Sequence, residues 1–354
     1  MAEQNLEKVD PNLASAGAGD GLRWYDVKKL GLEGQGWSDT ARPFDRFPAR
    51  AEAMIPPNVW GLSRHSAGLA VRFVTAARTI SVRWTLLHEG LAMAHMPATG
   101  MSGLDLYVRD GGAWKWTATG IPRAKENSQN LLADLEAGPA REYRLYLPLY
   151  NGTESLEIGI PEADALARAP AAAGKPLCFY GTSITQGGCA CRPGMAYTAI
   201  AARKLDRAHY NFGFSGNGRM EPALAELLAE LDPAAYVLDA FPNMTDVLIR
   251  ERLAPFVRIL RKAHPATPIL VMENIHYTGH TLIAARRTAF EGKNQAAREV
   301  CATLHDEGVT RLTLVPGGIL LGPDLEGTVD GTHPTDLGFL RMAEAIVPFL
   351  QPMI

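Results

Sequence analysis

A serine lies where an apolar stretch of the sequence gives way to a polar turn. Residues 177–180 have the apolar character of a buried strand, and Gly181, Thr182 and Ser183 follow them directly. A serine hydroxyl is a weak nucleophile that needs a base, usually a histidine held by a carboxylate. Taken alone, Ser183 is more simply a turn residue, because serines are common in turns.

His333 is the best candidate for that base among the nine histidines. It lies in the segment DGTHPTD (330–336), with Asp330 three residues before it. This spacing lets the carboxylate reach the imidazole, fix its tautomer and stabilise the imidazolium. Asp336 is a rival carboxylate, but its place at the start of a predicted helix favours capping or solvent exposure. Taken alone, the segment is a loop in which Thr335 caps that helix.

Acyl transfer also needs hydrogen-bond donors for the oxyanion. The glycine-rich segment NFGFSGNG (211–218) allows backbone N–H groups to approach a ligand closely. Asn243, in DAFPNM, could donate from its side-chain amide, although capping the next helix is the commoner role. The glycine-rich segment could instead cradle a phosphate, but no G-x-G-x-x-G motif or P-loop lysine accompanies it, so nucleotide binding has little support.

The elements that would position these residues change in character along the chain. Between about residues 20 and 165, short runs alternate apolar and polar residues and are separated by turn sequences. This pattern predicts antiparallel sheets packed as a sandwich or jelly roll. From residue 176 onward, near-continuous apolar runs alternate with amphipathic segments, which predicts an α/β fold with a parallel sheet covered on both faces.

The second half is expected to hold five strands, each followed by a helix. The predicted helices lie near residues 195–206, 219–231, 245–263, 282–305 and 335–349. Ligands of such sheets bind beyond the carboxyl ends of the strands, where the candidate residues fall. The predicted organisation is a flexible N-terminus (1–19), an accessory β-sandwich domain (20–165), a linker (166–175) and an α/β domain (176–354).

Composition and charge exclude several kinds of partner. The 354 residues carry a net charge of −3 without basic runs, which argues against nucleic acid or an anionic membrane as a partner. No segment approaches the roughly 18 apolar residues that span a bilayer. The N-terminal residues lack a signal-peptide pattern, so we expect a cytoplasmic protein unless an export signal has been removed.

The cysteines give little support to a metal site. Four of them are too few for a disulfide framework in a chain of this size. Cys189 and Cys191 have C-x-C spacing, but a metal needs further ligands, and the nearest histidine, His209, falls in a predicted strand. We therefore expect no metal and no cofactor, with a small-molecule or glycan ester as the partner; the oligomeric state is not readable.

The candidate segments, taken together, resemble those of the SGNH hydrolase family, also called GDSL-like esterases and lipases. GTS at 181–183 is similar to the family's nucleophile block, with Thr182 in place of the usual Asp. FSGNG places Gly216 at the glycine of the second block, and AFPNM keeps the Asn of the third block without its glycine and Asp. Asp330 and His333 match the D-x-x-H block.

The resemblance covers roughly the second half of the chain, from residue 176. It implies a three-layer, flavodoxin-like domain with a Ser183, His333 and Asp330 triad. It also implies an oxyanion hole made by the Ser183 and Gly216 N–H groups and the Asn243 amide. The N-terminal region resembles the sandwich that precedes the catalytic domain in a two-domain branch containing esterases of acylated sugars and some acyltransferases.

The implied function is a serine esterase acting through an acyl-serine intermediate. We expect a short acyl group, acetyl most simply, on a sugar or other polar alcohol, because no long apolar loop resembles a lipase lid. An acyltransferase using the same triad and an inactive glycan-binding protein are the alternatives. Residues 56–68 from the first half, and His276 and Tyr277 from the second, could border the pocket.

Overall fold

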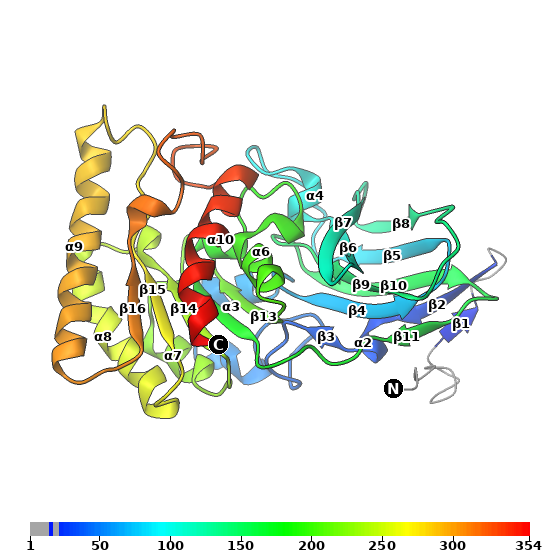
Figure 1. Cartoon of the computed structure of the whole chain (residues 1–354), viewed down its shortest axis with the longest axis horizontal. Helices are drawn as coiled ribbons and strands as arrows, with labels where there is room; N and C mark the ends of the chain where they lie inside the picture. Colours follow the sequence, from blue (N-terminus) through cyan, green and yellow to red (C-terminus); the bar gives the residue numbers. More distant parts are fainter. Residues whose placement is uncertain (1–13, 17–20) are drawn as a thin grey trace.

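The computed structural model describes residues 14–16 and 21–354, which form a β-rich half and an α/β half (Figure 1). Residues 14–16 make a short strand, and the rest of the expected flexible N-terminus lies outside the described residues. Along the described part of the chain, none of the helices is long and apolar enough to cross a membrane.

Two antiparallel sheets make the β-rich half. The first has the order β1 (Ala14–Ala16), β2 (Leu22–Asp26), β10 (Thr153–Pro161), β5 (Ile80–Leu86) and β8 (Glu126–Leu132). The second has the order β11 (Leu166–Arg168), β4 (Ala70–Thr75), β9 (Arg141–Tyr146), β6 (Leu104–Asp110) and β7 (Ala113–Gly120), with β3 (Leu32–Glu33) paired to β4. Alternate residues such as Phe73 and Trp84 share one buried core, so the predicted sandwich is confirmed.

The last strand of the sandwich lies inside the segment that the sequence assigned to the linker. β11 pairs antiparallel with β4, and Leu166 is fully buried in the sandwich core. Three residues are too few to show an alternating pattern, and the surrounding alanines and prolines hide the strand further. The sandwich therefore extends to residue 168.

A five-stranded parallel sheet forms the centre of the α/β half. Its order is β13 (His209–Gly213), β12 (Leu177–Gly181), β14 (Ala235–Asp239), β15 (Ile269–Met272) and β16 (Leu312–Val315). The side chains of β12 alternate between two cores, because Tyr180 packs into one cluster and Phe179 into the other. Both faces of the sheet are therefore buried, as the sequence predicts.

Helices cover both faces of this sheet (Figure 1). One face carries α7 (Pro222–Leu228), α8 (Asp246–Ala263) and α9 (Ala284–Asp306), and the other carries α6 (Tyr197–Lys204) and α10 (Asp336–Leu350). The expected helices are confirmed, although α7 is shorter than predicted because Pro222 begins it. The remaining short elements are α2 (Val27–Leu30), η2 (Ala49–Ala53), α3 (Pro57–Ser63), α4 (Ala98–Met101), α5 (Ser183–Gln186), η3 (Pro193–Met195), η4 (Phe241–Asn243), η5 (Gly317–Ile319) and η6 (Gln351–Met353).

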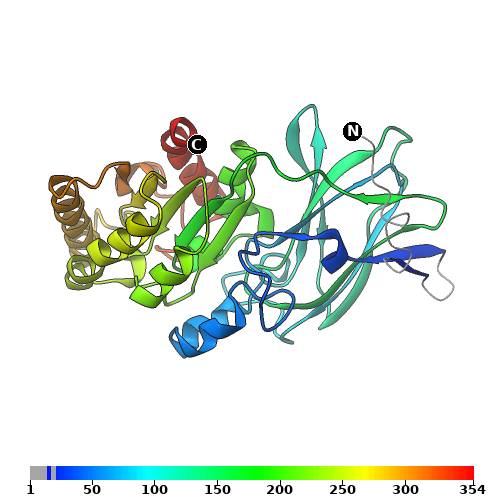
Figure 2. The same cartoon turned by 90° about the horizontal axis from the view of Figure 1, so that it is seen from below.

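The segment between β3 and β4 belongs to the core of the α/β half, although it precedes most of the sandwich in sequence. The Phe47 ring stacks on Phe212 of β13 with centroids 5.1 Å apart. The fully buried Arg46 donates to the main-chain oxygens of Asn211 (2.7 Å) and Gly213 (3.0 Å). Figure 2 shows α3, drawn in blue, on the side of the α/β half. The two halves therefore share a core and are not joined by a simple linker.

Candidate active site

Ser183 is the first residue of α5, which follows β12, an inner strand of the parallel sheet. Thr182 caps this helix, because its hydroxyl accepts a hydrogen bond from the Ile184 N–H at 3.3 Å. The residue that replaces the family's usual Asp therefore shapes the turn that presents the serine. Ser183 is only 6% exposed, and it lies at the carboxyl edge of the sheet.

His333 lies between Ser183 and Asp330. Its Nε2 is 2.9 Å from Ser183 Oγ, and its Nδ1 is 2.7 Å from Asp330 Oδ2. Because the carboxylate accepts the Nδ1–H, the neutral ring has its lone pair on Nε2 and can accept the serine proton. The structure thus brings together the three residues that the sequence singled out. Ser183 follows the carboxyl end of β12, and Asp330 and His333 lie in the loop before α10.

Asp330 is held as a carboxylate. Burial raises its pKa, but hydrogen bonds from the His333 main-chain N–H, the His333 ring and the Thr332 N–H outweigh burial and lower the pKa to about 2. The two main-chain donors lie 2.8 and 2.9 Å from Oδ1. Oδ2 is therefore left to orient the ring.

The turn after Asp330 is fixed as the sequence suggested, with one difference. Thr335 caps α10 by accepting from the Gly338 N–H at 3.2 Å. Asp336 does not cap the helix or face only solvent; its Oδ1 accepts from the Cys191 N–H at 3.0 Å. This bond links the loop that carries His333 to the loop after α5. Such a long-range contact cannot be predicted from the local sequence.

Gly216 and the Ser183 main chain have free donors near this edge. In residues 21–354, neither N–H donates to another protein group. Gly216 has φ +68°, a left-handed conformation that favours glycine, and nothing lies within 4 Å of the position where a Cβ would stand. Both N–H groups are therefore available to a ligand.

Asn243 lies beside the same glycine loop. Its Nδ2 donates to the Asn217 main-chain oxygen at 2.8 Å, which leaves its second amide hydrogen available. The alternative role as a helix cap is wrong, because Thr245 caps α8 through the Leu248 N–H. The structure thus places Asn243 next to the loop that carries Gly216.

Two residues that sequence reasoning missed support the serine turn from behind. Tyr150, from the β-rich half, donates from its hydroxyl to the Ser183 main-chain oxygen at 3.1 Å. A Cβ on Gly188 would come within 2.8 Å of that hydroxyl and 3.5 Å of His333 Cδ2. Because a Cβ would also lie 3.1 Å from the Ser183 main-chain oxygen, position 188 needs a glycine for the Tyr150 hydroxyl and the serine turn to approach so closely.

Residues 56–68 reach the site, as the sequence suggested they could. Nδ1 of His65 is 3.0 Å from Nε2 of Gln186 in α5, and Gln186 Oε1 accepts from the Ser215 N–H at 3.0 Å. Burial, together with the charge of Arg46, lowers the pKa of His65 to about 3, so the ring is neutral and accepts from the amide. Gln186 therefore links the serine helix to the glycine loop and to the β-rich half.

A cleft of about 650 Å³ opens next to this contact. Its lining combines apolar side chains, among them Leu62 and Leu87, with polar ones, namely Arg42, Asn58, Arg64, His65 and His88 from the β-rich half and Asn217 from the α/β half. His276 and Tyr277, by contrast, are engaged in packing, because His276 stacks on Phe290 at 4.2 Å and the Tyr277 hydroxyl accepts from Lys293. The β-rich half, and not the segment after β15, supplies this polar wall.

A parallel five-stranded sheet with a hydrogen-bonded serine, histidine and aspartate at its carboxyl edge is the arrangement of an SGNH-type domain. Residues 174–351 match the GDSL-like Lipase/Acylhydrolase family, and residues 22–166 match the N-terminus of Esterase_SGNH_hydro-type. The chain therefore belongs to the GDSL-like lipase/acylhydrolase family, in its two-domain form. No curated protein matches the chain.

Solved structures share both halves of the fold. A protein described as a GDSL-like lipase from Bacteroides ovatus ATCC 8483 is 34% identical, with a TM-score of 0.89 over 94% of this chain and 98% of that one. A salicylyl-acyltransferase from a tetracycline biosynthetic pathway is 20% identical, with a TM-score of 0.73 over 94% of each chain. An acetyl xylan esterase from the rumen bacterium Butyrivibrio proteoclasticus is 15% identical, with a TM-score of 0.61 over 94% of this chain and 98% of that one.

Proposed function

We propose that the protein is a serine ester hydrolase that removes a short acyl group, acetyl in the simplest case, from a sugar or other polar alcohol. The observation that carries the proposal is the hydrogen-bonded series from Ser183 Oγ through His333 to Asp330, with distances of 2.9 and 2.7 Å. A hydroxyl activated in this way attacks ester carbonyls in many unrelated folds. Membership of the acylhydrolase family supports the same chemistry.

The proposed reaction proceeds in two halves. His333 accepts the proton of Ser183 as Oγ bonds to the ester carbonyl carbon, and the N–H groups of Ser183 and Gly216 with the Asn243 amide stabilise the oxyanion. His333 then gives that proton to the departing alkoxide, which leaves an acyl-serine. Water attacks the acyl-serine, again with His333 as base, and the carboxylic acid and free serine are released.

The polar side chains of the cleft support a polar alcohol as the leaving group. Its lining from the β-rich half offers hydrogen-bond donors and acceptors beside Asn217, the neighbour of the proposed oxyanion donor Gly216. A sugar presents hydroxyl groups and apolar ring faces, so a surface that mixes polar and apolar side chains suits it. The acetyl xylan esterase that shares the fold is consistent with this substrate class.

An acyltransferase is the second candidate, because the salicylyl-acyltransferase shares the arrangement of both halves. The same triad serves both reactions, and only the nucleophile that resolves the acyl-serine differs. An inactive glycan-binding protein fits less well, because a triad in hydrogen-bonding geometry has no part in glycan recognition.

The test is acetate release from p-nitrophenyl acetate and a panel of acetylated sugars. We expect release by the wild type and by Ser155→Ala, a control at an exposed serine of β10, and none above background by a folded Ser183→Ala. Equal release by Ser183→Ala would refute the proposal. If the wild type releases no acetate, mass spectrometry for an acyl-serine, with and without alcohol acceptors, distinguishes a transferase from an inactive protein.

A further inference from the structure

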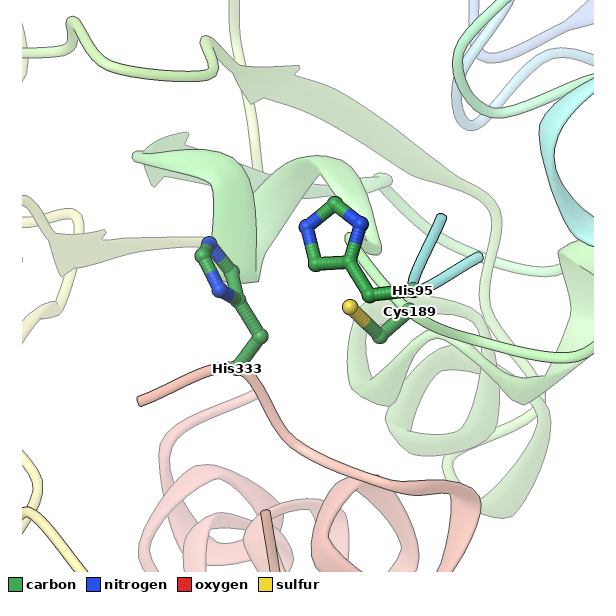
Figure 3. A group of neighbouring side chains, drawn as sticks. All are labelled: His95, Cys189 and His333. Carbon is green, nitrogen blue, oxygen red and sulfur yellow. The ribbon is translucent and has the colours of Figure 1, made fainter. Parts of the chain in front are cut away.

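A thiol and a second imidazole lie beside the proposed catalytic base. His95, Cys189 and His333 each offer one ligand atom, and these atoms lie within 4.8 Å of one another (Figure 3). The ring centroids of His95 and His333 are 5.6 Å apart, with the rings nearly perpendicular. The three side chains come from separate segments, namely the loop after β5, the loop after α5 and the loop before α10.

The spacing is close to that of metal ligands. Zn–N bonds of about 2.0 Å and Zn–S bonds of about 2.3 Å in a tetrahedral site place the ligand atoms roughly 3.3 to 3.6 Å apart. The observed group needs to close by about an ångström to reach this spacing. His95 is exposed, so its ring is the ligand with the most freedom to make this adjustment.

The backbone around each ligand is already fixed. Cys189 is 6% exposed, and its neighbour Gly188 donates from its N–H to the Ser183 oxygen at 2.8 Å. His95 lies in a tight turn closed by two hydrogen bonds between Met93 and Met96, at 3.0 and 3.1 Å. The Thr99 hydroxyl also donates to the Cys191 oxygen at 2.6 Å, which joins the loop that carries His95 to the loop that carries Cys189.

His333 has the hydrogen bonding that metal-bound histidines commonly have. Asp330 accepts the Nδ1–H at 2.7 Å, so Nε2 is the nitrogen left to bind an ion. That same nitrogen accepts the proton of Ser183 in the proposed reaction. An ion on Nε2 and the reaction therefore exclude each other.

We propose that His95, the Cys189 thiolate and His333 Nε2 bind one Zn²⁺ with a water as fourth ligand, and that this ion reversibly blocks the esterase site. One thiolate and two imidazoles suit zinc and exclude Mg²⁺ and Ca²⁺, which prefer oxygen ligands. As the Zn–S bond forms, the thiol proton passes to water, and Ser183 keeps its own proton because its base is occupied. The inhibition rests on the proposed esterase function, whereas the binding of zinc does not.

Binding is tested without reference to activity. Zinc chloride is titrated calorimetrically into untagged, reduced full-length protein, and Co²⁺ is used as a second probe because a Co–thiolate bond gives an absorption band. We expect one Zn²⁺ per chain, and an affinity at least tenfold lower in His95→Ala and in Cys189→Ser. Cys191→Ser, at the neighbouring thiol, should bind as the wild type does, and so should Ser183→Ala.

The same variants test inhibition. Zinc should abolish ester hydrolysis by the wild type, a chelator should restore it, and His95→Ala should keep its activity and resist zinc. No zinc binding by the wild type, or equal binding by His95→Ala and Cys189→Ser, would overturn the site. Stoichiometric binding with undiminished hydrolysis would overturn the blockade. If the wild type binds zinc through these residues but has no esterase activity, the zinc site stands and only the proposed function is refuted.

Discussion

The hydroxyl of Tyr150 donates a hydrogen bond to the main-chain oxygen of Ser183 at 3.1 Å, so the β-rich half directly supports the residue proposed as nucleophile. That oxygen also accepts from the N–H groups of Gly187 (3.1 Å) and Gly188 (2.8 Å). The turn is therefore held by two local bonds and one bond from the other half. This relationship gives the sandwich a role in positioning the site as well as in lining the cleft.

Tyr150→Phe should cause a small loss of both stability and activity. The two local N–H donors remain, so the Ser183 oxygen is not left unsatisfied, and the net loss should be about 1 kcal/mol of unfolding free energy. We expect kcat to fall less than about tenfold, which corresponds to that energy. Urea unfolding and p-nitrophenyl acetate kinetics measure the two effects. A loss of kcat as large as that of Ser183→Ala would mean that the phenol takes part in the chemistry.

Asp330→Asn should leave the fold intact and lower kcat by about 10³ to 10⁴. An amide cannot accept the Nδ1–H as the carboxylate does, and its N–H group favours the tautomer in which Nε2 carries the proton and cannot act as base. In the wild type the pKa of Asp330 is lowered to about 2, so Asp330 stays a carboxylate under ordinary assay conditions and its own protonation should not limit the rate there. Wild-type kcat in Asp330→Asn would exclude the carboxylate from the reaction.

Asn243→Ala should lower kcat by about 10² to 10³, the usual cost of removing one oxyanion donor. KM should change little, because the donor acts mainly on charge that develops in the transition state. The substitution also removes the 2.8 Å bond to the Asn217 main-chain oxygen, so urea unfolding of the variant is needed as a control for the integrity of the loop. Wild-type kcat in Asn243→Ala would exclude the amide from the oxyanion hole.

The sequence predicted the parts of the fold and site that depend on local pattern. Apolar runs predicted the parallel sheet. The residue types after the first strand and before the last helix of the α/β half predicted Ser183 and His333, which the structure places 2.9 Å apart. The contacts between the halves could not be predicted in this way. In the sequence, Tyr150 and His95 look like ordinary residues of a sandwich. Only the packing of the β-rich half against the α/β half brings Tyr150 to Ser183 and His95 to His333.

Asp239 should make the protein less stable as the pH rises from about 4 to about 7. Its carboxyl group lies beneath α5 and accepts from Tyr197 (3.0 Å) and Thr185 (3.1 Å), but burial outweighs these bonds and raises its pKa from 3.8 to about 7. The folded state therefore binds a proton that the unfolded state has lost between these values. The contribution is complete below about pH 4 and falls by about 1.4 kcal/mol per pH unit up to about pH 7.

Asp239→Asn removes that titration. The unfolding free energy of the variant, relative to the wild type, should rise from about pH 5 to 7 and then level off, as urea unfolding across that range can measure. The absolute stability of the variant also depends on how its amide contacts Tyr197 and Thr185. The test is therefore how the difference in unfolding free energy changes with pH, and not its value at one pH. Parallel pH curves for the two proteins would show that Asp239 does not titrate in this range.

Replacing His88 tests whether the cleft binds the alcohol part of the substrate. Its side chain is exposed and lines the cleft next to His65, so replacing it should not disturb the fold. If the imidazole makes one hydrogen bond to a bound sugar, His88→Ala should raise KM for acetylated sugars by about five- to tenfold and leave kcat nearly unchanged. Hydrolysis of p-nitrophenyl acetate, which has no sugar, should be unaffected.

Glu89→Ala is the matched control, because Glu89 is the exposed neighbour of His88 and lies outside the cleft lining. It should show wild-type KM for every substrate. Equal KM values for acetylated sugars in the wild type and His88→Ala would remove this residue from alcohol binding. A parallel loss on p-nitrophenyl acetate would instead mean that His88 does not act through contact with the sugar.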